Sequence, residues 1–258
     1  MAGLLRYGDG AVAVGSSALV LLGAEGTPIR DCSEVMVRDS QPRDPVGRRD
    51  PPPHRAQSAV RLSVRQFEAA APTVRVGRFT VAAPEVALAQ AVPELSHRSA
   101  IAVMDSMLRK RLIDRHGIDQ AHRLARGRRG VARTHPWWKE PDGRAESVLE
   151  SHGRVECLEH DVPPDDLQVE IRDDRGVVLG RGDLGWRLDD EGWLLVELDG
   201  REFHERPAAL LHDRSRQNDL VLGGRAHLLR FTARDLANPG HLARTVRRAL
   251  AQWRKPAA

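Results

Sequence analysis

The chain has 258 residues, 41% of them hydrophobic and 29% charged, so it is long enough to bury the core of one large domain or two small ones. Its formal net charge of +4 is a modest surplus, compatible with phosphate contact but equally with an Arg-rich composition that carries no function. Because Cys32 and Cys157 lie far apart and form no CxxC pair, the sequence implies neither a disulfide framework nor a cysteine-based zinc site, and a reducing compartment fits best.

The first apolar stretch, Ala11–Leu22, is too short to span a bilayer, and a glycine and two serines interrupt it. It therefore does not read as a secretory leader. Ser16 and Ser17 are residues that cap helices, and Gly23 is a residue that ends them, which predicts a short helix from Ser17 to Leu22. We expect a cytoplasmic protein without a membrane segment.

The rest of the first half alternates exposed and apolar segments. Ile101, Met104 and Leu108 recur at helical spacing and indicate an amphipathic helix. In chain order, the predicted elements are an exposed loop at 39–57, short strands at 60–62 and 79–82, two helices between 84 and 112 that Pro93 separates, and a basic helix at 117–129.

A segment rich in Pro, Gly and Trp follows at 133–143 and is interpreted as a linker. The sequence thus predicts a smaller accessory α/β region at 1–132 and a second domain at 144–258. We expect the two halves to fold separately.

The second half shows a regular succession of elements. Leu167, Val169 and Ile171 alternate with polar residues, which is typical of a half-buried strand. The predicted elements are a helix at 144–159, strands at 167–171, 177–184 and 193–199, a helix at 207–222, a strand at 227–231 and a helix at 241–253. This order predicts an α/β fold with a mixed sheet flanked by helices.

Three carboxylates stand in these strands where apolar residues are expected. Asp183 ends one strand, and Glu197 and Asp199 lie two residues apart on the next, so a period of two places both on one face. If the two strands pair, Asp183 approaches Glu197. Clustered carboxylates repel one another unless a cation neutralises them, and Mg²⁺ prefers such oxygen ligands. The pattern predicts a divalent-metal site that activates water for attack on a phosphate, although Asp199 followed by Gly200 is also an ordinary turn.

Other polar residues are candidates for the same site. Glu146 and Glu150 lie one helical turn apart, and one of them, with Glu150 preferred, is expected to reach the metal. His204 follows the turn at Gly200 and suits a general acid or base near neutral pH. The alternatives are that the two glutamates form a solvated helix face and that His204 is a surface residue.

Five blocks of the second half resemble, in order, the DUF559 family. They are AESVLES (145–151), GRGDLGW (180–186), LLVELDGREFH (194–204), HDRSRQNDLVLGG (212–224) and HLLRFTARDL (227–236). That family is related to the very-short-patch-repair endonucleases and belongs to the PD-(D/E)XK nuclease superfamily. The resemblance covers roughly 145 to 250 and implies a restriction-endonuclease-like fold.

The resemblance also implies roles for particular residues. Asp183 matches the metal-binding aspartate, and Glu197, Asp199 and His204 match positions around the scissile phosphate, so these four and Glu150 are the implied catalytic set. Asp199 stands where the wider superfamily has lysine, and the repair-endonuclease branch uses histidine instead, a part that His204 can take.

Two arginines in the matching blocks, Arg216 and Arg230, are candidates for DNA contact, and Asp213 is an i,i+3 partner for Arg216. The first half resembles, over residues 4–26 and 104–110, the C-terminal region of AbiEi-type antitoxin proteins. Together these features predict a DNA endonuclease that depends on Mg²⁺ or another divalent cation such as Mn²⁺. The alternative is a non-catalytic DNA-binding or antitoxin-like regulator that keeps the nuclease fold.

Overall fold

The chain divides into two compact units, Met1–Gly143 and Arg144–Ala258. The computed structural model describes residues 11–28, 32–37, 61–64, 71–188, 192–200 and 226–253, with backbone alone for 32–37 and 61–64. The second unit begins where the second domain is expected, and the first unit is the longer of the two. Among the described residues, no helix has the length and apolar character needed to cross a membrane.

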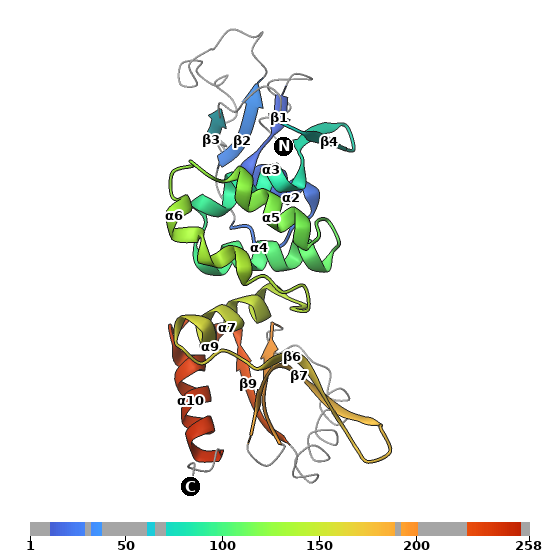
Figure 1. Ribbon diagram of the computed structural model, residues 1–258, viewed down its shortest axis with the longest axis vertical. Helices are drawn as coiled ribbons and strands as arrows, with labels where there is room; N and C mark the ends of the chain where they lie inside the picture. Colours follow the sequence, from blue (N-terminus) through green and yellow to red (C-terminus); the bar gives the residue numbers. More distant parts are fainter. Residues whose placement is uncertain are drawn as a thin grey trace, which may run out of the picture. The chain divides into compact units, whose positions relative to one another are not determined.

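The first unit contains a mixed five-stranded sheet (Figure 1). Its strands are β1 (Ala11–Ala13), β2 (Cys32–Val37), β3 (Arg61–Val64), β4 (Thr73–Val76) and β5 (Phe79–Ala82), in the order β3-β2-β1-β5-β4. β1 runs parallel to β5 and antiparallel to β2, so both sides of the central strand are paired. The sequence predicts β3 and β5 but not the other three.

The helices of this unit follow the predicted breaks. They are α2 (Gly15–Leu22), α3 (Pro84–Ala91), α4 (His97–Arg109), α5 (Arg115–Leu124) and α6 (Val131–Thr134), with 3-10 turns η2 (Val92–Glu94) and η3 (Pro136–Lys139). Pro93 lies in η2 and separates α3 from α4, as predicted. Gly23 ends α2 with φ of 89°, but the expected serine cap is absent there because Val14 holds the N-cap position.

The segment 133–143 belongs to the first unit and is not a free linker. Trp138 is 2% exposed and stacks on His122 of α5. The backbone N–H of Asp142 donates to the buried Asp105 carboxylate at 2.7 Å. Trp138 and the Asp142 N–H therefore anchor this segment to the rest of the first unit.

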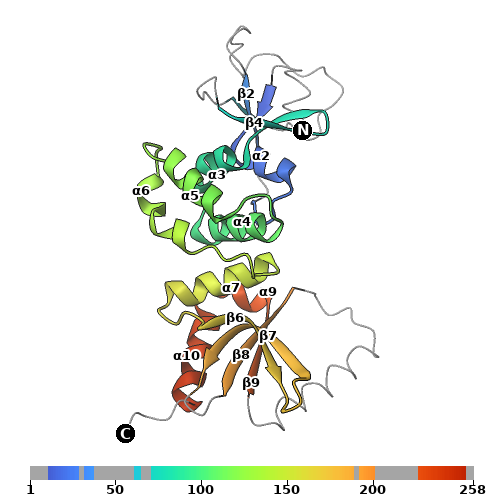
Figure 2. The ribbon, with the colours of Figure 1, turned by 45° about the vertical axis from the view of Figure 1, so that its right-hand side comes forward.

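The second unit is built on a four-stranded mixed sheet (Figure 2). Its elements are α7 (Val148–Glu159), β6 (Asp166–Arg172), β7 (Val178–Arg187), β8 (Trp193–Asp199), β9 (Ala226–Thr232), α9 (Ala233–Leu236) and α10 (His241–Trp253). The strand order is β6-β7-β8-β9, antiparallel except for the parallel β8–β9 pair. The predicted α/β class, with mixed sheets flanked by helices, is confirmed. The helix expected at 207–222 lies outside the described residues.

One face of this sheet packs against α7, α9 and α10, which lie on the same side of it in Figures 1 and 2. Leu194, Val196 and Leu198 of β8 point into that core because alternate residues of a strand share a face. At Gly153 an added Cβ would lie 2.7 Å from Leu198 Cδ1, so the glycine lets α7 approach β8 closely. This contact sets the position of α7 over the sheet.

Candidate active site

The candidate site lies where β7 leaves β8. The two strands pair over Leu184–Arg187 and Trp193–Val196, while β7 continues its pairing with β6 as a hairpin (Figure 1). Asp183 is the first β7 residue beyond that pairing. Its Oδ2 accepts a hydrogen bond from the backbone N–H of Leu198 at 2.7 Å. The carboxylate thus reaches β8 where the ladder has ended.

Gln168 of β6 lies between the pairs that flank Asp183. Leu167 pairs with Leu184 and Val169 pairs with Gly182. The backbone of Gln168 has φ of 54°, in the left-handed region that strands of L-residues avoid. Its Nε2 donates to Glu150 Oε2 at 2.8 Å, and its side chain lies close enough to Asp183 to lower the pKa of that carboxyl.

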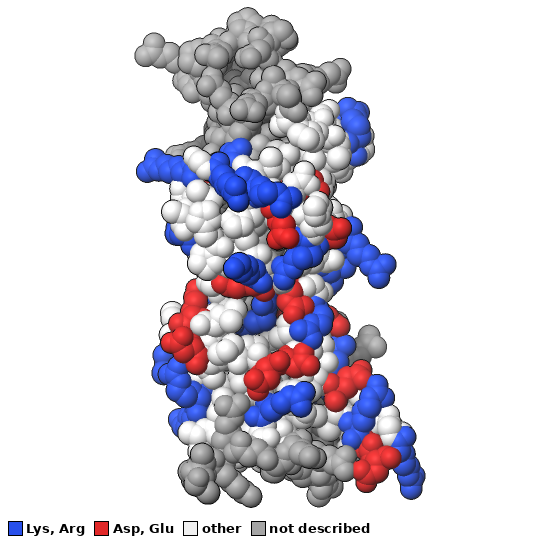
Figure 3. Space-filling model, viewed as in Figure 1, with Lys and Arg blue, Asp and Glu red and all other residues white. Residues whose placement is uncertain are grey.

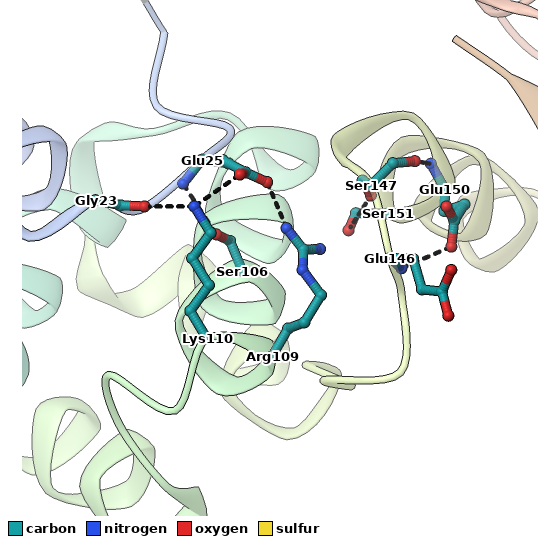
Figure 4. A network of polar contacts seen from close by, with 9 residues as sticks. All are labelled: Gly23, Glu25, Ser106, Arg109, Lys110, Glu146, Ser147, Glu150 and Ser151. Carbon is teal, nitrogen blue, oxygen red and sulfur yellow. Dashed lines mark hydrogen bonds and ion pairs between the residues drawn. The ribbon is translucent and has the colours of Figure 1, made fainter.

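Glu150 reaches the site from the first turn of α7. Ser147 is the N-cap, and its hydroxyl accepts from the Glu150 N–H (Figure 4). The Glu150 carboxylate in turn accepts from the backbone N–H of Glu146 at 2.7 Å. Glu150 is 6% exposed, whereas the Glu146 side chain is 51% exposed and forms an ion pair with Arg181 of β7. Because α7 begins at Val148, Glu146 precedes the helix, contrary to the expectation that both glutamates lie on it, and Glu150 is the buried one of the two.

Burial dominates the electrostatics of this carboxylate pair. It raises the pKa of Glu150, and the nearby charge of Asp183 raises that pKa further, against the hydrogen bonds from Glu146 and Ser147. Burial likewise raises the pKa of Asp183, although the Leu198 N–H, Arg181 and Gln168 act in the opposite direction. Two desolvated carboxylates therefore come together from α7 and β7, an arrangement that a cation would stabilise.

We expect Glu150→Gln to be more stable than the wild-type protein at pH 7 without metal. A carboxyl whose pKa rises on folding contributes stability below its unfolded value, near 4.5, and loses it as the pH rises through the folded value. The amide removes the charge but keeps an oxygen acceptor, so the difference should vanish below about pH 4. Thermal melts of both proteins across this range measure it. If Glu150→Gln is less stable than the wild type at pH 7, the favourable effect of the Glu150 charge at the start of α7 outweighs the cost of burying that charge.

Glu197 and Asp199 lie on the other face of β8. They alternate with the core residues Val196 and Leu198, so they share a face with each other, as the period of two predicts. Glu197 pairs with Arg230, its register partner on β9, at 2.7 Å, and both side chains are partly exposed. Arg230 thus has an acidic partner within the sheet.

The expected cluster of three carboxylates is not formed in the described part of the chain. No group of three or more His, Cys, Asp or Glu side chains there is arranged to hold a metal ion. The physical reason is that Asp183 lies beside Gln168, which hydrogen-bonds Glu150 of α7, while Glu197 and Asp199 face away from α7. His204, Asp213 and Arg216 lie outside the described residues.

Two residues of the site, Gln168 and Arg181, were not predicted from the sequence. Gln168 looks like an outward polar residue of an alternating strand, and Arg181 like a charge on an exposed one. For Gln168 no sequence signal announces the left-handed backbone. For Arg181 the available signal is its place two residues before Asp183 in the GRGDLGW block.

The chain is similar to two proteins of Mycobacterium tuberculosis, one from strain CDC 1551 / Oshkosh and one from strain ATCC 25618 / H37Rv, both described as uncharacterized. Each is 32% identical over 146 residues, which cover 55% of this chain. The chain spans about half the length of these curated relatives, since the match covers 51% of each. No family model and no solved structure matches the chain.

Proposed function

We propose that the second unit is a DNA endonuclease domain that hydrolyses phosphodiester bonds with Mg²⁺ or Mn²⁺. The observation that carries the proposal is the convergence of Asp183 and Glu150, two desolvated carboxylates on different elements. The sequence resemblance to DUF559 and the very-short-patch-repair endonucleases points to the same chemistry. Cytoplasmic location and DNA as the partner are parts of this proposal.

The residues present fit a hard divalent cation. Mg²⁺ is usually bound through one or two carboxylates, with water and substrate phosphate completing its shell, so three carboxylates are not required. Gln168 adds an amide oxygen, Oε1, that is buried and has no hydrogen-bond partner among the described residues. Carboxylate and amide oxygens are the ligand types that such a cation takes.

A divalent cation at this site would act as a Lewis acid that activates water and offsets charge on the phosphate. Asp183 and Glu150 would hold it, with Asp183 fixed by the Leu198 N–H and Glu150 by the backbone N–H of Glu146, just before α7. Arg181 is exposed beside them and suits contact with a phosphate oxygen once it leaves Glu146. His204 stays the proposed general acid or base.

Contacts with the DNA backbone are proposed for two basic segments, 123–133 and 244–255. In the first unit Arg123, Arg126 and Arg129 are exposed, and in the second Arg244 and Arg248 of α10 are. Figure 3 shows basic side chains interspersed with acidic ones on the face it presents. The DNA affinity that these arginines contribute should fall as the salt concentration rises. Arg216 and Arg230 remain the candidates for contact near the site.

The second candidate is a DNA-binding or antitoxin-like regulator without turnover. The ion pair between Glu197 and Arg230 favours it, because that pair occupies a carboxylate that a three-ligand metal site would use. A regulator of this kind would bind DNA equally well with and without a divalent cation.

Supercoiled plasmid separates the two candidates. We expect the full chain to convert it to nicked or linear forms with Mg²⁺ or Mn²⁺ and to leave it intact in EDTA. Gel retardation of the same DNA in EDTA measures binding apart from cleavage. Retardation without cleavage in either metal would overturn the endonuclease proposal and support the regulator.

A further inference from the structure

Gln168 holds a backbone conformation that its position in the chain does not explain. Three non-glycine residues in the described ranges have positive φ: Arg111, Asp161 and Gln168. Arg111 follows the end of α4 and Asp161 follows the end of α7, where a left-handed residue is a common way to end a helix. Gln168 lies inside β6, where a positive φ is unfavourable and does not serve to end a helix.

The strained residue changes which side chains face the carboxylates. Leu167 belongs to the core under the helices, whereas Val169 belongs to the cluster on the opposite face, so the alternation of β6 breaks at Gln168. The break lets the Gln168 amide reach Glu150 and Asp183 at once. Oε1 of the same amide is buried and lacks a partner among the described residues.

We propose that Gln168 is a positioning residue that holds Glu150 and Asp183 together and offers its amide oxygen to the bound cation, an inference that rests on the proposed function. Without a cation, Nε2 donates to Glu150 and lies beside Asp183. A half-turn of the amide about its last torsion exchanges Nε2 for Oε1, so one side chain serves both states. In this proposal, the strained backbone of Gln168 is what places its amide beside Glu150 and Asp183.

Two substitutions separate positioning from a structural role. Gln168→Gly tolerates the positive φ but removes the amide, so its melting temperature should stay within about 4 °C of wild type. Its affinity for Mn²⁺, measured by calorimetry on the full chain without DNA, should fall at least about tenfold. Gln168→Glu places a third negative charge beside Glu150 and Asp183. It should melt lower than wild type in EDTA and recover when Mn²⁺ is added.

Asp161→Gly is the matched control, because it relieves a positive φ of the same size on an exposed residue after α7. It should keep the Mn²⁺ affinity of the wild type. Mn²⁺ binding by Gln168→Gly equal to wild type would overturn the inference about Gln168 alone. Absence of Mn²⁺ binding by the wild-type chain would overturn both this inference and the metal-dependent function.

Discussion

Asp183→Asn should reduce divalent-metal-dependent plasmid cleavage at least about 100-fold, because replacing even the outer partners of metal ligands typically costs 10–100-fold. The loss should not come from unfolding. An asparagine oxygen can still accept the Leu198 N–H, and burial already disfavours the charged form of this carboxyl. The cleavage rate at saturating Mg²⁺ and the melting temperature in EDTA are the two measurements.

Glu170→Gln is the comparison for this variant. Glu170 is an exposed carboxylate on the neighbouring strand β6, paired with Arg172, and it takes no part in the proposed site. It should cleave at the wild-type rate. If Asp183→Asn also cleaves at the wild-type rate, Asp183 does not serve the reaction and the proposed site is wrong.

Helices and strands with a strong pattern of apolar residues were predictable from the sequence. Short strands that form only by pairing with neighbouring strands were not. β8 and α10 have the predicted bounds, because an apolar run that follows a turn and apolar residues at helical spacing both report burial. β1 has three residues within an apolar run, and it becomes a strand through pairing with β2 and β5. Such short strands depend on tertiary contacts that no local pattern encodes.

The site was predictable only in part for a related reason. The spacing of residues correctly places Glu197 and Asp199 on one face of β8. It cannot show that Asp183 of β7 lies near Gln168 and Glu150 instead of near these two carboxylates. Asp183 lies just beyond the end of the β7–β8 ladder, and the alternation of the neighbouring β6 breaks at Gln168. Both are properties of how strands meet in space, and a period of two assumes that neither occurs.

Glu156→Ala should lower the free energy of unfolding of the second unit by about 2–4 kcal/mol. Glu156 is fully buried on α7, and its Oε1 accepts from the backbone N–H groups of Leu242 at 2.9 Å and Ala243 at 3.4 Å. These donors lie in the first turn of α10, where a helix has no acceptors of its own. Alanine would leave them buried without this partner and remove an anion from the positive end of the helix.

Glu156→Gln isolates the cause of that loss. It keeps an oxygen for the Leu242 and Ala243 N–H groups and removes only the charge, so we expect a loss of about 1 kcal/mol or less. Urea denaturation followed by tryptophan fluorescence, to which the buried Trp186 of the second unit contributes, compares both variants with the wild type. Equal losses in the two would show that the charge, not the hydrogen-bond acceptor, ties α7 to α10. Since α7 also carries Glu150, this anchor fixes the helix that brings one of the two proposed metal-binding carboxylates to the sheet.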